Sequence, residues 1–195
     1  YDYMPKFIDD KIGTFTVPTS WLDSLNGLAC VILGPVLGAL WYKLARRPQG
    51  DWSLYKKASI ALFLLGVTFG ILALTEFTRG VGAPESQKAS ILWVILFFIV
   101  MSLAEMFFSP LGASFVSKYA PKQILSIMMA VWIVATFGAA KGYSLLYSKI
   151  ADLPIIQVAL GIGAVCVVVA ALVFIFEKKL AGLVELREGE TLVEE

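Results

Sequence analysis

Residues 90–116 read SILWVILFFIVMSLAEMFFSPLGASFV, and this stretch decides the fold class. A helix needs roughly 20 apolar residues to cross a hydrocarbon core about 30 Å thick, and this run exceeds that length. A single acidic residue, Glu105, lies near its middle. A run of this kind predicts a membrane-spanning helix.

The rest of the chain repeats the pattern. Of its 195 residues, 58% are apolar and only 16% are charged, and that share of charge is too low for a water-soluble domain. The fold class is therefore expected to be all-α, a polytopic membrane helix bundle. We expect five spans, at about 20–45, 54–78, 89–117, 122–148 and 153–177.

The chain divides into three parts. We expect residues 1–19 to form the outer end of a preceding helix, YDYMPKFIDDK at 1–11, followed by an external loop. Residues 20–178 form the transmembrane bundle, and residues 179–195 form a cytoplasmic tail whose composition is typical of a solvated or disordered end. Five spans that begin outside suggest that an amino-terminal part is missing.

The basic residues predict the orientation. The loops between spans are short, so neighbouring spans are antiparallel. Ten basic residues fall on one side: Lys43, Arg46, Arg47, Lys56, Lys57, Lys118, Lys122, Lys178, Lys179 and Arg187. Five fall on the other side: Lys6, Lys11, Arg79, Lys88 and Lys149. Cytoplasmic loops carry the excess of Lys and Arg, so Tyr1 is expected outside and Glu195 inside.

Several functions are disfavoured by composition. The net charge is +1, which indicates no nucleic-acid partner. There is no histidine, and Cys30 and Cys166 lie inside apolar runs, where a thiol usually packs as a small apolar group. We expect no metal site, no cofactor and no enzymatic activity.

Glu105 is the most informative residue. Insertion scales put the cost of a comparable acid at a helix centre at about 2.5–3.5 kcal/mol, and such residues usually face a polar cavity or a partner. Apolar surroundings favour a protonated carboxyl group and a nearby cation favours the ionised form. A cation that moves toward or away from the carboxyl group can therefore make it release or bind its proton. Ser109 lies one turn later, beside Pro110. The alternative is a permanent pair between Glu105 and a buried Lys or Arg.

Other residues have two interpretations each. Asn26, inside the first span, suits an interhelical hydrogen bond or a substrate contact. Trp132 and Thr136 share one helix face and suit either a pocket wall or packing. Close helix packing is expected at the GxxxG pairs 34/38, 66/70 and 138/142. Glu76 lies near an outer end and is expected at the membrane interface.

Three stretches resemble the proton-dependent oligopeptide transporters of the major facilitator superfamily. PTSWLDSLNGLACVILGPVLGALW (18–41) is similar to that family's eighth helix, SLAEMFFSPLGASFVSKYAP (102–121) to its tenth, and IMMAVWIVATFGAA (127–140) to its eleventh. The resemblance covers helices eight to twelve, so the chain would be the C-terminal half of a major facilitator fold with one helix missing.

The resemblance implies a function. The whole protein would be a proton-coupled symporter in the cell membrane that imports di- and tripeptides by alternating access, together with its missing amino-terminal half. Asn26, Glu105, Ser109, Trp132 and Thr136 would bind the peptide, and Glu105 would couple binding to protons. The alternatives are a carrier of the same superfamily for nitrate or a drug, and a non-transporting membrane scaffold.

Overall fold

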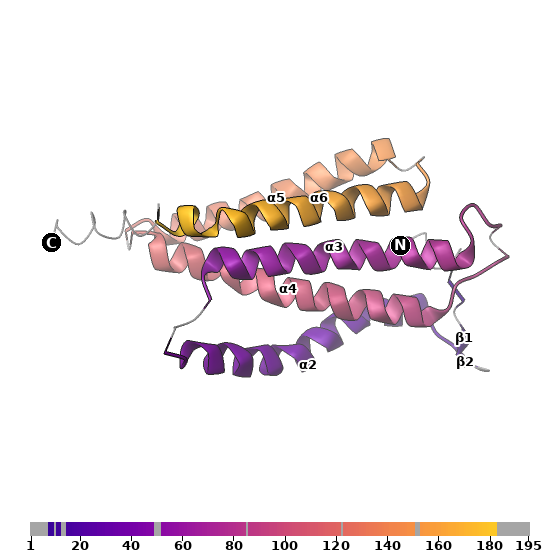
Figure 1. Ribbon diagram of the computed structural model, residues 1–195, viewed down its shortest axis with the longest axis horizontal. Coiled ribbons are helices and arrows are strands. Elements are labelled where there is room, and N and C mark those ends of the chain that lie inside the picture. Colours follow the sequence, from indigo (N-terminus) through magenta and orange to yellow (C-terminus); the bar gives the residue numbers. More distant parts are fainter. Residues whose placement is uncertain are drawn as a thin grey trace.

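In the residues that it describes, the computed structural model has five long helices that run back and forth along one axis (Figure 1). It describes residues 8–9, 11–12, 15–48, 52–84, 86–121, 123–150 and 153–182. The helices are α2 (Thr19–Ala45), α3 (Leu54–Arg79), α4 (Ile91–Tyr119), α5 (Leu125–Ile150) and α6 (Ile155–Ile175). Their bounds differ from the expected spans by up to three residues, at the start of α5. The all-α class is confirmed.

A short hairpin precedes the bundle. Strand β1 (Lys11–Ile12) pairs antiparallel with β2 (Phe15–Thr16). Most of the expected end of a preceding helix, residues 1–7 and 10, lies outside the described residues. Lys11, which we assigned to that helix, lies in a strand instead.

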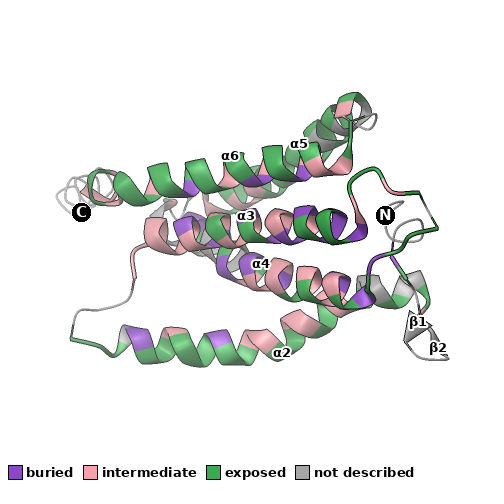
Figure 2. Cartoon of the chain, turned by 45° about the vertical axis from the view of Figure 1, so that its right-hand side comes forward, coloured by how far each residue is buried: buried purple, intermediate pink, exposed green. Residues whose placement is uncertain are grey.

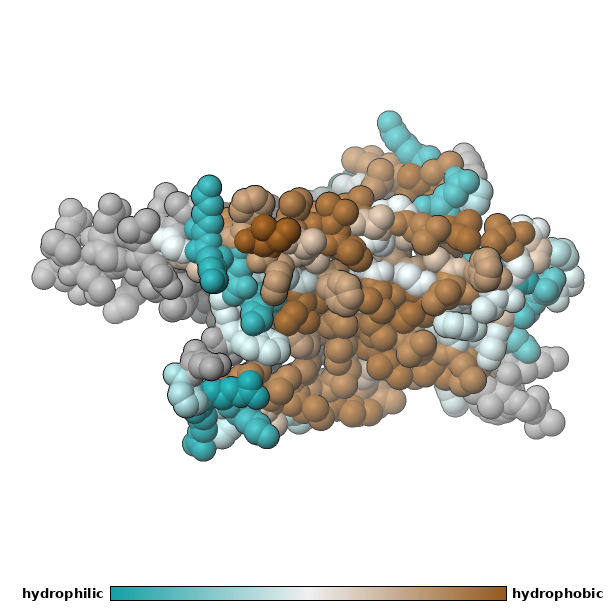
Figure 3. All heavy atoms as spheres, viewed as in Figure 1, coloured by the Kyte–Doolittle hydropathy of each residue, from teal (hydrophilic) through white to brown (hydrophobic). Residues whose placement is uncertain are grey.

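The helices suit a bilayer. All five are long and apolar enough to cross a membrane by length and composition. Hydrophobic side chains cover the middle of the face in Figure 3, and hydrophilic side chains gather toward its two ends. Backbone groups in lipid must be satisfied internally, which helices achieve. The described part of the chain therefore has five helices suited to span a membrane.

Local chemistry sets the ends of the helices. Ser53 caps α3 by accepting a hydrogen bond from the backbone N–H of Lys56 at 3.1 Å, and Ser90 caps α4 through the N–H of Leu92 at 3.4 Å. Such caps satisfy N–H groups that have no partner within the helix. Gly80 ends α3 with φ 100°, a conformation that residues with a Cβ rarely adopt.

Helix α3 lies at the centre of the bundle. It packs against α6 on one side and α4 on the other, and α4 also contacts α2 and α5. Figure 2 shows buried residues concentrated along α3 and α4, whereas α5 and α6 are largely exposed. Helix α2 is bent (Figure 1) and contains Pro35, whose ring removes one helical hydrogen bond and favours a kink.

Close packing at the GxxxG pairs occurs at one position. A Cβ on Gly66 would lie 2.7 Å from Cγ2 of Val167 and 3.2 Å from the carbonyl oxygen of Gly163, so α3 and α6 touch backbone to backbone there. For the other five glycines of these pairs, the expectation of close helix packing is wrong within this chain. A Cβ would have no neighbour within 4 Å at Gly34, Gly38, Gly70, Gly138 or Gly142.

Two apolar clusters join α2 to α4 and the segments around them. The first, near the hairpin, has Ile8, Ala89, Ile91 and Val94 at its centre, and Leu25 and Phe98 pack against it. The second, toward the other end, is built on Leu37, Ala61 and Phe107. Along α2, Asn26 lies between the residues that belong to the two clusters. Ser102 lies between them along α4.

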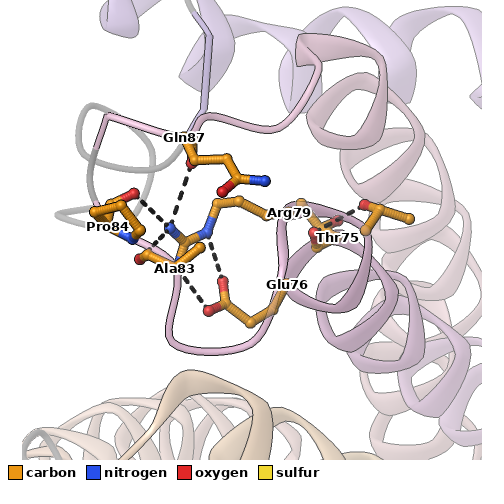
Figure 4. A network of polar contacts seen from close by, with 7 residues as sticks. Thr75, Glu76, Arg79, Ala83, Pro84 and Gln87 are labelled. Atoms are coloured by element: carbon orange, nitrogen blue, oxygen red, sulfur yellow. Dashed lines mark hydrogen bonds and ion pairs between the residues drawn. The ribbon is translucent and has the colours of Figure 1, made fainter.

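A buried ion pair closes the end of α3. Glu76 and Arg79 are each only 4% exposed, and Arg79 Nη2 lies 2.6 Å from Glu76 Oε1. Figure 4 shows the Arg79 guanidinium group also donating to the carbonyl oxygens of the α3–α4 loop. The interfacial depth expected of Glu76 stays a prediction, and the structure adds that the protein itself encloses the carboxylate.

Arg79 organises the loop that follows. Its Nη1 donates to the carbonyl oxygens of Ala83, Pro84 and Gln87 at 2.9, 3.3 and 3.4 Å. The same loop receives the segment before α2, since the backbone N–H of Asp9 donates to the carbonyl of Ala89 at 2.8 Å. The Arg79 guanidinium group thus holds the α3–α4 loop, and the segment at Asp9 packs against that loop.

Candidate functional site

Helices α2 and α4 bring together a polar cluster of three residues, Asn26, Ser102 and Glu105. The side-chain nitrogen of Asn26, Nδ2, donates to Oε2 of Glu105 at 3.2 Å. The hydroxyl group of Ser102 donates to Oδ1 of Asn26 at 2.5 Å. We call these three residues the α2–α4 polar cluster.

Helix geometry explains why α4 contributes two members. Ser102 and Glu105 are three residues apart, so they project from the same helix face. Glu105 is the fifteenth of the 29 residues of α4 and therefore lies at its midpoint. The cluster therefore lies near the middle of the helix, about equally far from its two ends.

Glu105 has no cationic partner among the described residues. Its hydrogen bond there is to the neutral amide of Asn26, and the acid that pairs with an arginine is Glu76. The side chain of Glu105 is exposed on this chain. The alternative of a permanent pair with a buried Lys or Arg therefore finds no support in the described part of the chain.

Ser102 is the site residue that the sequence analysis missed. It is completely buried, with 0% exposure, and its hydroxyl group also lies 2.7 Å from the carbonyl oxygen of Phe98. The sequence held a signal, because a serine one turn before a mid-membrane acid shares its face. Nothing in the sequence indicated that Asn26 would lie opposite it.

Ser109 can be placed only by its backbone. It stands in α4 one turn after Glu105, in the direction of Tyr119, and its side chain lies outside the described residues. Its expected role in peptide binding therefore stays a prediction.

Trp132 packs against α4. A Cβ on Gly112 would overlap the six-membered ring of the Trp132 indole, so the absence of a side chain at Gly112 makes room for that ring. Gly112 lies seven residues after Glu105, about two helical turns along α4. The contact brings α5 against the same helix that carries the polar cluster.

Thr136 follows Trp132 by one turn on α5. Its side chain is exposed and its hydroxyl group donates to the carbonyl oxygen of Ile133 at 2.7 Å. Among the described residues, no hydrogen bond connects Trp132 or Thr136 to the α2–α4 polar cluster. The structure thus joins Asn26 to Glu105 directly and keeps the two α5 residues as a separate group.

Cys30 is a further neighbour of Asn26. Its sulfur lies 3.8 Å from Oδ1 of Asn26, one turn along α2. A thiol is a weak hydrogen-bond donor, so this contact is minor beside the Ser102 hydroxyl. The cluster can hold a proton or a cationic group at the carboxylate, and its other members are neutral.

Known proteins match this chain in sequence. A family model described as the POT family matches residues 3–155. A di-/tripeptide transporter of Lactococcus lactis subsp. cremoris is 36% identical over 122 residues, which are 63% of this chain and 23% of that protein. An uncharacterized transporter of Bacillus subtilis (strain 168) is 32% identical over 139 residues, which are 70% of this chain and 26% of that protein.

Solved structures match it in shape. The crystal structure of a POT family transporter in complex with a thioalcohol-conjugated peptide superposes with a TM-score of 0.80 at 25% identity. That match covers 91% of this chain and 36% of the solved chain. A POT family transporter in complex with 5-aminolevulinic acid gives the same values. The chain spans about a quarter of the length of the two relatives above and about a third of these solved chains.

Proposed function

The chain belongs to the POT family, and on that premise we propose that it is the C-terminal part of a proton-coupled symporter that imports di- and tripeptides. The observation that carries the proposal is the hydrogen bond between Asn26 and Glu105 across α2 and α4. An acid at the middle of a spanning helix, held by a neutral amide, remains available to a cationic ligand.

The chemistry of a peptide suits this arrangement. A di- or tripeptide carries an ammonium group at its amino end, and a carboxylate can bind it through charge-assisted hydrogen bonds. One oxygen of Glu105 accepts from Asn26, and the other has no hydrogen-bond partner among the described residues. Asn26 and Glu105 would bind the amino end of the peptide, with Ser109 one turn farther along α4.

Trp132 and Thr136 are proposed to line a pocket for peptide side chains. The packing of the Trp132 indole on Gly112 would give that pocket a rigid wall, because the ring is held by a backbone surface. The exposed side chain of Thr136 would face the same space. Support for this part of the site comes from the family resemblance and from the position of α5 beside α4.

Proton coupling follows from the same carboxylate. Protonation removes the charge that attracts the peptide ammonium group, and a cation favours the ionised form. Alternating access would come from the two halves of the transporter rocking around a midplane site, with the partner half supplied by the amino-terminal part of the whole protein. A potential of 100 mV contributes about 2.3 kcal/mol per charge moved, which can drive uptake.

We place the protein in the cell membrane, with Tyr1 outside and Glu195 in the cytoplasm. Support comes from the ten-to-five excess of basic residues on one side of the bundle. In this orientation the Glu76–Arg79 pair lies at the outer end and the start of α3 at the inner end.

The test uses the full-length transporter in proteoliposomes with an imposed pH gradient. We expect accumulation of dialanine, and competition by other dipeptides but not by nitrate. Glu105→Gln keeps the shape and removes the titratable charge, so gradient-driven accumulation should be lost while exchange of peptide without a gradient persists in part. Glu177→Gln, an acid near the end of α6, is the matched control and should accumulate dialanine normally.

Three outcomes would contradict the proposal. Wild-type accumulation by Glu105→Gln would remove the coupling role from this residue. Competition by nitrate or a drug with no effect of dipeptides would identify a carrier for another solute. No transport of any solute by the wild-type protein would favour a membrane scaffold.

A further inference from the structure

We propose that Ser102 is a positioning residue that fixes the side-chain amide of Asn26, so that its NH2 group faces Glu105. The inference rests on the proposed function, because it concerns how the peptide-binding carboxylate is held. Ser102 contacts Asn26 twice, with its hydroxyl group 2.5 Å from Oδ1 and 3.4 Å from the backbone oxygen.

The first step concerns the direction of the amide. An ionised carboxylate only accepts hydrogen bonds, whereas an asparagine side chain has a donating NH2 group and an accepting oxygen. The end of Asn26 that faces Glu105 at 3.2 Å must therefore be Nδ2. Its oxygen then faces the opposite way, and a donor there is needed to keep it in that direction.

Ser102 supplies that donor. The torsion that turns an asparagine amide is broad and nearly two-fold, so the amide is not fixed by its own stiffness. Without the hydroxyl group, Oδ1 would keep only the thiol of Cys30, a weak donor at 3.8 Å. A reversed amide would place an oxygen against the Glu105 carboxylate, where two acceptors repel each other.

The competing role for Ser102 is a bond to its own helix. Its hydroxyl group is 2.7 Å from the carbonyl oxygen of Phe98, four residues earlier, and buried serines often bond in this way. However, that carbonyl already has the backbone N–H of Ser102 as its helical partner. Among the described residues, no backbone N–H donates to Oδ1 of Asn26, so the Ser102 hydroxyl group is its main donor.

The consequence concerns affinity for peptide. When the amide is held, one oxygen of Glu105 is occupied by Asn26 and the other is directed to the ligand without reorganisation. Groups whose supporting shell fixes their geometry bind more tightly than groups that must be ordered on binding. Loss of the Ser102 hydroxyl should therefore weaken peptide binding and leave the later steps of transport nearly unchanged.

The experiment is a double-mutant cycle in the full-length transporter, measured as dialanine exchange in proteoliposomes. Ser102→Ala should raise KM about three- to tenfold, the value of one net hydrogen bond, with the maximal exchange rate within about twofold of wild type. Ser102→Cys keeps the buried volume with a weaker donor and should give an intermediate KM. In an Asn26→Ala background, Ser102→Ala should change KM little, because the group it acts through is gone.

Ser59→Ala is the matched control. Ser59 is a buried serine on α3, 4% exposed, whose hydroxyl group donates to the Tyr55 carbonyl oxygen at 3.0 Å. It has the helix bond of Ser102 but lies outside the polar cluster, so its replacement should leave KM unchanged. An equal rise in KM for Ser59→Ala and Ser102→Ala would overturn the proposal, as would fully multiplicative effects of Ser102→Ala and Asn26→Ala.

Failure of the proposed function would be visible separately. If the wild-type protein carries no dialanine, the peptide assignment fails, whatever the variants do. The melting temperatures of wild type, Ser102→Ala, Asn26→Ala and the double variant then still report on the interaction between Ser102 and Asn26. Non-additive shifts would support Ser102 acting through Asn26, and additive shifts would overturn it.

Discussion

Two acids in the apolar helices of this chain have opposite surroundings. Glu76 is buried beside Arg79, whose other hydrogen bonds hold a loop. Glu105 has a neutral amide as its partner. A buried charge costs several kcal/mol unless it is paired, and Glu76 has its partner within this chain. Glu105 has no cationic partner among the described residues, and it is the acid that we propose binds a ligand or a proton. This difference separates a stabilising acid from a candidate site acid.

Arg79→Gln should destabilise the protein strongly. Removing one partner of a buried ion pair typically costs about 3–5 kcal/mol, because the other charge is left uncompensated. Arg79→Lys should restore little, since an ammonium group cannot reproduce the forked contacts to Glu76 and the loop carbonyl oxygens. We would measure the melting temperature of the full-length transporter in detergent, with Lys149→Gln, an exposed cation in the last turn of α5, as the control. Equal melting temperatures for Arg79→Gln and Lys149→Gln would contradict this role.

At the scale of elements, α3 and α6 approach each other backbone to backbone. Gly66 and Gly163 face each other there, with Val167 and Phe69 packed beside them. Without a hydrophobic effect between helices in lipid, association depends on van der Waals packing between closely approaching backbones. The contact therefore depends on the absence of a Cβ at Gly66.

Gly66→Ala should weaken this contact, whereas Gly70→Ala should not. The new methyl group at position 66 would meet Val167 Cγ2 at 2.7 Å and a backbone oxygen at 3.2 Å, and overpacking of this kind costs about 1–3 kcal/mol. At Gly70 a Cβ has no neighbour within 4 Å, so the higher helix propensity of alanine should leave stability unchanged or slightly raised. Thermal denaturation of both variants in detergent measures the difference. A lower melting temperature for Gly70→Ala than for Gly66→Ala would refute the assignment.

At the scale of the whole molecule, the bundle is unevenly covered. Of the α3 span 39% is buried within the chain, whereas none of the described residues of the α5 span is. Apolar side chains such as Phe137, 73% exposed, remain uncovered on α5. Lipid and the amino-terminal half of the proposed transporter are the surroundings that would cover such a surface, and this agrees with the fraction of its relatives that the chain spans.

The proposed orientation gives a labelling prediction. In a cysteine-free background, a cysteine in place of Pro48, in the α2–α3 loop, should react with an impermeant thiol reagent only from the cytoplasm. A cysteine in place of Val81, 57% exposed in the α3–α4 loop, should react only from outside. Intact cells and inside-out vesicles provide the two sides. The reverse pattern would overturn the orientation and the ten-to-five argument on which it rests.

The sequence by itself determined the fold class and the number of spans. Apolar runs of about 20 residues leave helices as the solution in lipid, and the expected spans end within three residues of the observed helix ends. It also singled out Asn26 and Glu105 as candidate site residues, because polar groups are costly at that depth. These inferences need only composition, periodicity and neighbouring residues.

Tertiary structure decided which of these residues meet. The pairing of Asn26 with Glu105 depends on the relative rotation and depth of two helices about 80 positions apart in sequence, and no local pattern encodes it. The same holds for the contact of Ser102 with Asn26. It holds also for Gly66, the one of the six GxxxG glycines at which a Cβ would meet another helix. The burial of Glu76 is of this kind too, since position along a helix gives the depth of a residue but not whether a neighbouring loop folds back over its side chain.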